Sequence, residues 1–259
     1  MKPERCVILG VGVDRVDMDR MVAIAEETVL ADRQCCIFAV NPEKIMTAQN
    51  NAALRECLNA AEYLIPDGIG AVIAARMRGT YVRDRVPGSE LMPRLCALAA
   101  ARRYRVFLFG AREQINAAAT HQLAKQYPGI RIVGRHNGYV DAADQDALVA
   151  KINAAAPNFL FVALGSPKQE EWISRNRDRL RVNVIQGVGG TFDVIAGAVR
   201  RAPPLWIRFH LEWLYRLFVQ PSRLKRQSPL LRFALLAMTG RLSDQPLALR
   251  AQSEQASLR

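Results

Sequence analysis

Short apolar runs alternate with longer segments of helical periodicity along most of this chain, and no other feature constrains its fold as strongly. The apolar runs are rich in β-branched and aromatic residues and cover Arg5–Val11, Cys35–Ala39, Tyr63–Ile65, Arg105–Phe109, Arg131–Gly134, Phe159–Leu164 and Asn183–Gly187. The helical segments between them include Met18–Leu30, Glu90–Arg102, Glu113–Tyr127, Asp144–Ala155 and Lys168–Leu180. This alternation predicts an α/β fold: a Rossmann-like, mainly parallel sheet with helices on both faces.

The loops after these predicted strands are where function is expected, because ligands of open α/β sheets bind beyond the carboxyl ends of the strands. Four such loops combine glycine, proline and polar residues: 41–43 (NPE), 66–70 (PDGIG), 165–170 (GSPKQE) and 187–193 (GVGGTFD). In the last loop, the backbone N–H groups of Gly187, Gly189 and Gly190 could approach a phosphate, although glycine turns also serve tight packing. We include these glycines among the predicted substrate-binding residues.

Asp67 is the candidate catalytic group in these loops. It follows an apolar strand end and lies between a proline and a glycine, in a turn that exposes its carboxylate at the rim of the sheet. Local pattern alone favours a structural role, because aspartate commonly bonds to its own backbone in such turns. However, Asn41, Arg85 and Gln169 also lie beyond predicted strands, so we expect several polar groups to converge on one crevice.

Two motifs near the N-terminus have structural interpretations that we favour over functional ones. Residues 10–12 (GVG) resemble the start of a dinucleotide-binding fingerprint, but its third glycine would fall at Arg15. Residues 17–19 (DMD) have the spacing of a metal-binding DxD motif, yet Asp17 stands where a helix should begin and is predicted to be its N-cap. No two histidines have ligand spacing, so neither a metal site nor a cofactor is predicted.

The cysteines and the apolar segments indicate a cytosolic chain. Its five cysteines are odd in number and form no CxxC pair, which predicts reduced thiols. The first residues show no signal peptide. No run of 18 uncharged apolar residues occurs, so no membrane span is predicted.

The net charge of +12 is concentrated near the C-terminus, where residues 200–259 hold eleven Lys and Arg but only three Asp and Glu residues. Within this part, residues 203–226 mix aromatic residues with arginines at helical spacing. Such a helix suits an anionic membrane surface, and the alternative is an ordinary helix docked on the core. We therefore predict a Rossmann-like domain (1–202), a basic amphipathic appendage that associates with membranes (203–242) and a disordered tail (243–259).

Eight segments together carry a resemblance to a known family. They read NPEKI, PDGIGAVIAARMRG, RVPGSELMP, FLFGARE, YPGIRIVGRHNGY, LGSPKQEEW, GVGGTFDVIAGAVRRAP and LEWLYRL-x3-P-x-R-x2-R. In this order, over Arg5–Arg226, they resemble the WecG/TagA/CpsF glycosyltransferases, which form glycosyltransferase family 26. Members of that family add a sugar to a lipid-linked diphosphate sugar during cell-wall or exopolysaccharide assembly.

The resemblance implies an inverting transfer from a UDP-sugar, without a DxD-bound metal, in a pocket of a Rossmann-like domain. By position, Asp67 would be the general base that takes the proton of the acceptor hydroxyl. Asn41 would line the pocket between donor and acceptor, and Arg85 and Gln169 would belong to the same pocket. Arg85 would also help to neutralise the charge that develops on the departing UDP.

The resemblance also gives the basic appendage a role. In the family such an appendage closes over the active site and contacts the membrane, and Arg216, Arg223 and Arg226 match its arginines. We therefore count these three among the predicted substrate-binding residues. One position departs from the family pattern: the family often has a threonine two residues before the asparagine, and here that residue is Ala39.

The expected protein is thus a hexosyltransferase in the cytoplasm, peripheral on the inner face of the bacterial cell membrane. It would move a hexose or N-acetylhexosamine, of the N-acetylmannosamine type, from a UDP-sugar donor to a polyprenyl-diphosphate-linked sugar acceptor. A UDP-glucose-dependent glucosyltransferase that builds a lipid-linked disaccharide for exopolysaccharide is the nearest alternative. A non-catalytic nucleotide- or nucleic-acid-binding module is the alternative from another class, although no nucleic acid is expected as a partner. A homo-oligomer stays open.

Overall fold

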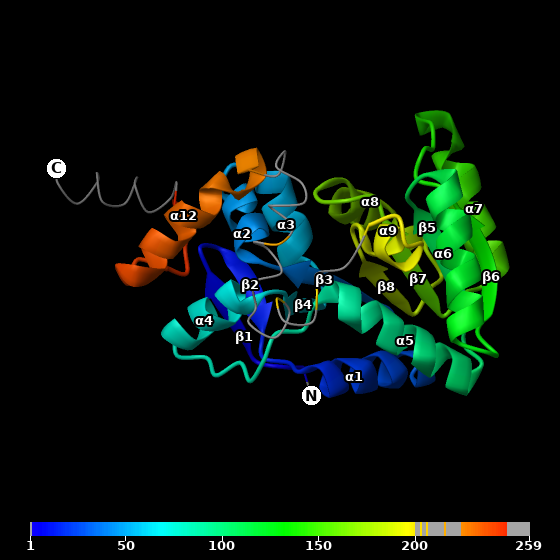
Figure 1. Ribbon diagram of the computed structural model, residues 1–259, viewed down its shortest axis with the longest axis horizontal. Coiled ribbons are helices and arrows are strands. Elements are labelled where there is room, and N and C mark those ends of the chain that lie inside the picture. Colours follow the sequence, from blue (N-terminus) through cyan, green and yellow to red (C-terminus); the bar gives the residue numbers. More distant parts are fainter. Residues whose placement is uncertain (1, 200–202, 204–205, 207–214, 216–223, 248–259) are drawn as a thin grey trace.

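The computed structural model describes residues 2–199, 203, 206, 215 and 224–247. A six-stranded parallel sheet lies at its centre, with the strand order β4-β3-β8-β7-β5-β6 (Figure 1). The strands of this sheet are β3 (Cys35–Val40), β4 (Tyr63–Pro66), β5 (Arg105–Gly110), β6 (Arg131–His136), β7 (Phe159–Ala163) and β8 (Val184–Gly187). The prediction of a parallel α/β fold is confirmed.

Helices cover both faces of the sheet. They are α1 (Met18–Leu30), α2 (Pro42–Gln49), α3 (Ala52–Asn59), α4 (Ile69–Met77), α5 (Gly88–Arg102), α6 (Glu113–Gln126), α7 (Gln145–Ala155), α8 (Lys168–Asn176), α9 (Thr191–Ile195) and α12 (Leu224–Met238), with 3₁₀ turns at Ala142–Asp144 and Arg177–Arg179. Successive side chains of a strand point to opposite faces. In β3, Phe38 belongs to the apolar cluster that contains side chains of α2, α3, α7 and α8, whereas Ile37 belongs to the cluster that contains side chains of α1, α5, α6 and α9. In Figure 1, α2 and α3 lie above the sheet and α1 and α5 below it.

The prediction that Arg5–Val11 forms one strand of the parallel sheet is wrong. It splits into β1 (Arg5–Ile8) and β2 (Val11–Asp14), which pair as an antiparallel hairpin. Leu9 and Gly10 at the turn have φ of 51° and 78°, as a tight two-residue hairpin turn requires. The apolar pattern runs through this turn without interruption, which is why the sequence did not reveal it. The glycines of the GVG motif thus serve a hairpin, and no dinucleotide-binding turn forms there.

A buried carboxylate joins this hairpin to the edge of the sheet. Asp14 accepts two hydrogen bonds from the guanidinium of Arg5, at 2.6 and 2.9 Å, and one from the backbone nitrogen of Leu64 in β4, at 2.7 Å. A buried carboxylate requires such partners to offset its lost hydration. The contact therefore holds the hairpin beside β4.

The capping interpretation of the DMD motif is confirmed. Asp17 accepts a hydrogen bond from the backbone nitrogen of Arg20 at 2.8 Å, at the start of α1, and Asp19 forms an ion pair with Arg94. These contacts account for both carboxylates. In the described ranges, no group of three or more His, Cys, Asp or Glu side chains could hold a metal ion.

The cysteines carry free thiols, as predicted, and four of the five are buried. Burial raises the pKa of Cys35 and of Cys36 to about 12. Almost no thiolate forms on these two residues at neutral pH, so they are unreactive core residues.

Several short helices were not predicted from the sequence. α2 and α3 have only eight residues each, too few for a periodic pattern to be recognised. Both begin at an asparagine, Asn41 or Asn51, whose side chain accepts a hydrogen bond at 2.9 Å from a backbone nitrogen of the first turn. Asparagine at an N-cap is a local signal that could have located them.

The C-terminal segment packs back onto the hairpin. α12 lies against α2, and Leu242 after it is buried. The backbone nitrogen of Leu9 donates to the carbonyl oxygen of Ser243 at 2.7 Å, and the nitrogen of Leu247 donates to a glutamine side chain of α2 at 3.0 Å. Residues 243–247, which the sequence assigned to the tail, are therefore bound to the folded domain.

Most of residues 203–226, where aromatic residues and arginines are mixed, lie outside the described residues. Within this segment, the rings of Trp206 and Tyr215 have centroids 5.8 Å apart at an angle of 58°. The division of the chain at residues 202 and 242 stays a prediction.

Candidate functional site

The carboxyl ends of β4, β3, β8 and β7 are neighbours in the sheet, and the four unusual loops begin there. Asp67 follows β4, Asn41 follows β3, Gly187 ends β8, and Gln169 lies in the first turn of α8 after β7. The helices after β3 and β8 pack on opposite faces of the sheet, and open α/β sheets bind ligands where the connections diverge in this way. The structure thus brings these four predicted residues to one edge.

Asp67 lies in the turn between β4 and α4. Its backbone nitrogen donates to the carbonyl oxygen of Val40 at 2.8 Å, and the residue is partly exposed. Gly68 has a φ of +92°, which favours glycine, and a Cβ there would meet nothing within 4 Å. A Cβ on Gly70 would lie 2.7 Å from the Cγ atom of Pro42. The turn therefore packs closely against the start of α2 at Gly70, whereas the space beside Gly68 is open.

Asn41 is the N-cap of α2, a role that the sequence analysis missed. Its Oδ1 accepts a hydrogen bond from the backbone nitrogen of Lys44 at 2.9 Å, and Pro42 follows at the start of the helix. Asparagine followed by proline is typical of helix starts. Within the described residues its Nδ2 has no hydrogen-bond partner, so this donor can face a ligand.

Arg85 comes from the loop between α4 and α5 and lies beside the end of β4. The next residue, Val86, donates its backbone N–H to the carbonyl oxygen of Pro66 at 2.7 Å. The guanidinium is mostly buried, and its Nη2 lies 3.4 Å from Oε1 of Glu90. The structure therefore places Arg85 next to the Asp67 turn.

Gln169 is buried and joins α8 to the glycine-rich loop after β8. Its Oε1 accepts a hydrogen bond from the backbone nitrogen of Gly189 at 2.9 Å. A Cβ on Gly187 would lie 2.9 Å from its Nε2, so glycine is needed there to admit the amide. The N–H of Gly189 is thus already bound by a side chain of the protein. For Gly187 and Gly189 the geometry therefore favours a role in tight packing over contact with a phosphate. A phosphate contact at Gly190, the N-cap of α9, stays a prediction.

A buried ion pair that the sequence analysis missed lies next to Gln169. Nζ of Lys44 lies 2.7 Å from Oε1 of Glu170, and the two side chains are 9% and 0% exposed. Burial alone would raise the pKa of Glu170, but the ammonium of Lys44 and the hydrogen bonds to the carboxylate outweigh it, so this pKa lies below its ordinary value. No local pattern could reveal the pair, because 126 residues separate its members.

The tail arginines of the predicted site are not placed by the structure. Arg216 and Arg223 lie outside the described residues, and for Arg226 the structure describes only a backbone position within α12. Their role in substrate binding therefore stays a prediction.

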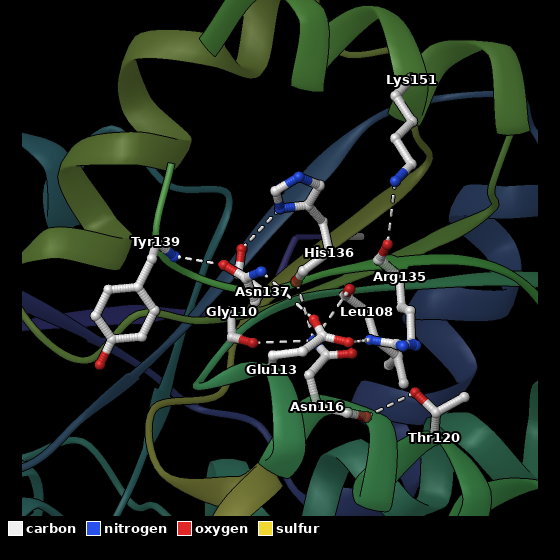
Figure 2. A network of polar contacts seen from close by, with 10 residues as sticks. All are labelled: Leu108, Gly110, Glu113, Asn116, Thr120, Arg135, His136, Asn137, Tyr139 and Lys151. Atoms are coloured by element: carbon white, nitrogen blue, oxygen red, sulfur yellow. Dashed lines mark hydrogen bonds and ion pairs between the residues drawn. The ribbon is translucent and has the colours of Figure 1, made fainter. Parts of the chain in front are cut away.

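The neighbouring ends of β5 and β6 are braced by a network of polar contacts (Figure 2). Asn116 of α6 is fully buried and donates to the carbonyl oxygens of Gly110 at 2.9 Å and His136 at 3.0 Å. On the outer side, Glu113 accepts a hydrogen bond from Arg135 at 2.6 Å. These contacts hold the two strand ends at a fixed spacing beside the candidate site, and they contain none of the predicted site residues.

A hollow of about 340 Å³ opens at the opposite edge, near the amino ends of β3 and β4. Two of the charged side chains that line it, Arg20 and Glu27, form an ion pair at 2.5 Å. None of the four unusual loops contributes to the lining of this hollow. We therefore place the candidate site at the carboxyl edge.

Comparisons with known proteins identify the family of the chain. The model of the family described as "Glycosyl transferase WecG/TagA/CpsF family" matches residues 6–246. The chain is 39% identical to a protein of Bacillus spizizenii strain W23 that is named N-acetylglucosaminyldiphosphoundecaprenol N-acetyl-beta-D-mannosaminyltransferase. That alignment spans 202 residues, which are 77% of this chain and 78% of the relative. All the predicted site residues fall within the range of the family match.

Proposed function

The chain belongs to the WecG/TagA/CpsF glycosyltransferase family, and on that premise we propose which sugar transfer it performs. A hexose or N-acetylhexosamine, of the N-acetylmannosamine type, passes from a UDP-sugar to a polyprenyl-diphosphate-linked sugar in cell-wall or exopolysaccharide synthesis. The name of the Bacillus spizizenii relative supports this donor over UDP-glucose. The family match supports a transferase over the nucleic-acid-binding alternative.

The observation that carries this proposal is the partly exposed Asp67, whose loop follows the neighbour of the Asn41 strand and lies at the same edge of the sheet as the loop of Gln169. Asp67 takes the proton of the acceptor hydroxyl as its oxygen attacks the anomeric carbon of the donor. The attack comes from the face opposite UDP, so the bond between that carbon and the β-phosphate oxygen breaks with inversion. The departing UDP takes the electron pair, and Arg85 and the appendage arginines neutralise the charge on its β-phosphate.

Ala39 bears on the choice of donor. The residue lies in β3, and a Cβ on Gly88 at the start of α5 would lie 3.2 Å from its methyl group. A threonine side chain at position 39 would be larger by two heavy atoms in this tight place. The proposed reaction therefore uses no hydroxyl at this position.

The proposed activity predicts a specific pattern of substrates. We expect the purified protein to release UDP from UDP-N-acetylmannosamine only when a short-chain lipid-diphosphate-N-acetylglucosamine acceptor is present. The assay follows UDP release and the lipid-linked product, with UDP-glucose and UDP-N-acetylglucosamine as competing donors. Faster transfer from UDP-glucose would replace the proposed donor with the alternative one, and no transfer from any UDP-sugar would refute the proposed function.

We place the enzyme on the inner face of the membrane as a peripheral protein. α12 exposes three large apolar side chains, Leu231, Leu235 and Met238, whose spacing of four and three residues puts them on one helical face. Leu231 is 80% exposed and Met238 is 77% exposed, and the neighbouring Arg232 and Arg241 are exposed too. Apolar and basic side chains combined in this way suit an anionic lipid surface.

Exposed side chains of α4 extend the proposed membrane-binding surface of α12. Ile73 and Met77 of α4 are exposed, and an ion pair between Arg78 and Asp244 joins the end of α4 to the segment after α12. Figure 1 shows α4 and α12 at the same end of the molecule. No helix in the described part of the chain is long and apolar enough to cross a membrane.

The membrane proposal predicts that the variant Leu231→Ser/Leu235→Ser/Met238→Ser binds anionic vesicles about tenfold or more weakly, because three apolar side chains no longer enter the lipid. Cosedimentation with phosphatidylglycerol vesicles measures this binding. Leu30→Ser is the matched control, since Leu30 in α1 is 74% exposed and lies away from α12. Equal binding by the triple variant and the wild type would show that α12 does not contact the lipid.

A further inference from the structure

The buried pair of Lys44 and Glu170 connects two of the helices that form the proposed site. Lys44 belongs to α2, which Asn41 caps, and Glu170 follows Gln169 in α8. Burial removes both charges from water, and their mutual attraction regains only part of the lost hydration. Apolar residues of similar size often replace such a pair without loss of stability. Stability alone is therefore a weak explanation for charges at this position.

The second oxygen of the carboxylate strengthens this argument. Oε2 of Glu170 is buried and has no hydrogen-bond partner among the described residues. Unpaired buried polar atoms are few in native proteins, because each loses its contacts with water and gains none in return. If the ion pair served only to hold α2 against α8, this unpaired oxygen would add no stability to the contact.

The carboxylate also determines how the amide of Gln169 is oriented. Oε1 of Glu170 accepts a hydrogen bond from Nε2 of Gln169 at 2.9 Å, in addition to the one from Lys44. A carboxylate can only accept, so Gln169 must turn its amide nitrogen toward Glu170 and its amide oxygen away. That oxygen accepts the hydrogen bond from the backbone nitrogen of Gly189. The chain of contacts thus runs from α2 through α8 to the loop after β8.

We propose that Lys44 and Glu170 are positioning residues for sugar transfer: their pair sets the amide orientation of Gln169 and thereby the place of the loop at Gly189. Neither residue of the pair touches the substrate. The proposal rests on the proposed function for its effect on turnover, whereas its effect on the loop is independent of any activity.

The first test removes the charges and keeps the volume. The variant Lys44→Met/Glu170→Met leaves no unpaired buried charge, so we expect it to fold with an unchanged or higher Tm. Without the carboxylate, the amide nitrogen of Gln169 loses its partner and only the hydrogen bond from Gly189 still holds the amide. We expect kcat to fall by about 10- to 100-fold, because small misplacements of site groups have effects of this size. We expect the KM for the UDP-sugar to change less than threefold. Full kcat in this stable variant would overturn the proposal.

The second test keeps the ion pair and reverses its direction. In Lys44→Glu/Glu170→Lys the charges remain paired, but an ammonium at position 170 can only donate. Gln169 must then turn its amide oxygen toward position 170. Its amide nitrogen would face the N–H of Gly189, and because both groups are donors, no hydrogen bond can form between them. If the pair served only to hold α2 and α8 together, kcat would be normal in this variant. The proposed positioning role predicts instead a loss of kcat at least as large as in the apolar variant.

Hydrogen exchange separates this proposal from the proposed function. We expect the segment 187–193 to exchange at least tenfold faster in the Lys44→Met/Glu170→Met variant, while the segment 88–102 of α5 keeps its rate. The matched control, Arg179→Met/Asp146→Met, removes an ion pair of 2.7 Å between exposed side chains and should change neither segment nor kcat. An unchanged exchange rate at 187–193 would refute the positioning role, and a faster rate would support it. Both conclusions hold even if the wild type transfers no sugar, because the exchange rate does not depend on activity.

Discussion

Replacement of Asp67 by asparagine is expected to lower kcat for sugar transfer by about 10²–10⁴-fold, the usual contribution of a general acid or base. Asparagine has nearly the shape of aspartate but cannot take the proton of the acceptor hydroxyl. The fold should persist, because the hydrogen bond that anchors this turn comes from the backbone nitrogen of residue 67, which the variant keeps. Single-turnover transfer with a short-chain lipid acceptor measures the effect, and thermal unfolding checks the fold.

Two measurements make this prediction specific. Calorimetry should show that Asp67→Asn binds UDP with nearly the affinity of the wild type, since the proposed base acts on the acceptor and not on the nucleotide. Asp178→Asn is the matched control, because the Asp178 side chain is 94% exposed and lies outside the loops of the proposed site. If Asp67→Asn raised KM and left kcat unchanged, the assignment of Asp67 as the base would be wrong.

The variant Arg216→Ala/Arg223→Ala/Arg226→Ala is expected to lower kcat by about 10²–10³-fold or more, the loss found when one donor to a developing oxyanion is removed. In the proposed reaction these guanidinium groups neutralise the departing UDP together with Arg85. The assay uses a short-chain acceptor that is soluble without a membrane, so weaker lipid binding cannot produce the loss. Normal kcat under these conditions would remove the three arginines from the reaction.

The structure also shows why point variants are a better test than a truncation. Deletion of residues 204–259 would remove Phe233 and Leu242, two buried side chains of the core cluster around α2, and would lower the stability as well as the activity. Arg232→Ala/Arg250→Ala/Arg259→Ala is the matched control for charge, because it removes the same number of arginines from the same part of the chain. We expect this control to keep its kcat.

The fold was largely predictable because its signals are local. Each strand of the parallel sheet coincides with an apolar run, and α1 has the predicted bounds because its N-cap, Asp17, and its periodicity both lie within the segment itself. The error at Arg5–Val11 has the same origin: apolar periodicity does not show that the chain reverses at Leu9 and Gly10. The helices α2 and α3 were missed because eight residues carry little periodic information.

The candidate site was predictable only in part. Its location followed from the rule that carboxyl ends of parallel strands meet at one edge, and Asp67, Asn41 and Gln169 do lie there. The use of each polar atom did not follow from it. Asn41 caps a helix, and the N–H of Gly189 is bound by Gln169, so two groups assigned to the substrate also serve the fold.

By itself, the sequence determined the class of fold, the edge of the sheet at which the proposed site lies and the family, because periodicity, capping residues and ordered motifs are all properties of short segments. Only the tertiary structure decided the strand order, the reversal of the N-terminal hairpin and the pairing of Lys44 with Glu170. The physical reason is distance along the chain: 126 residues separate these two charges, and they meet only once β3 and β7 have taken their places on either side of β8.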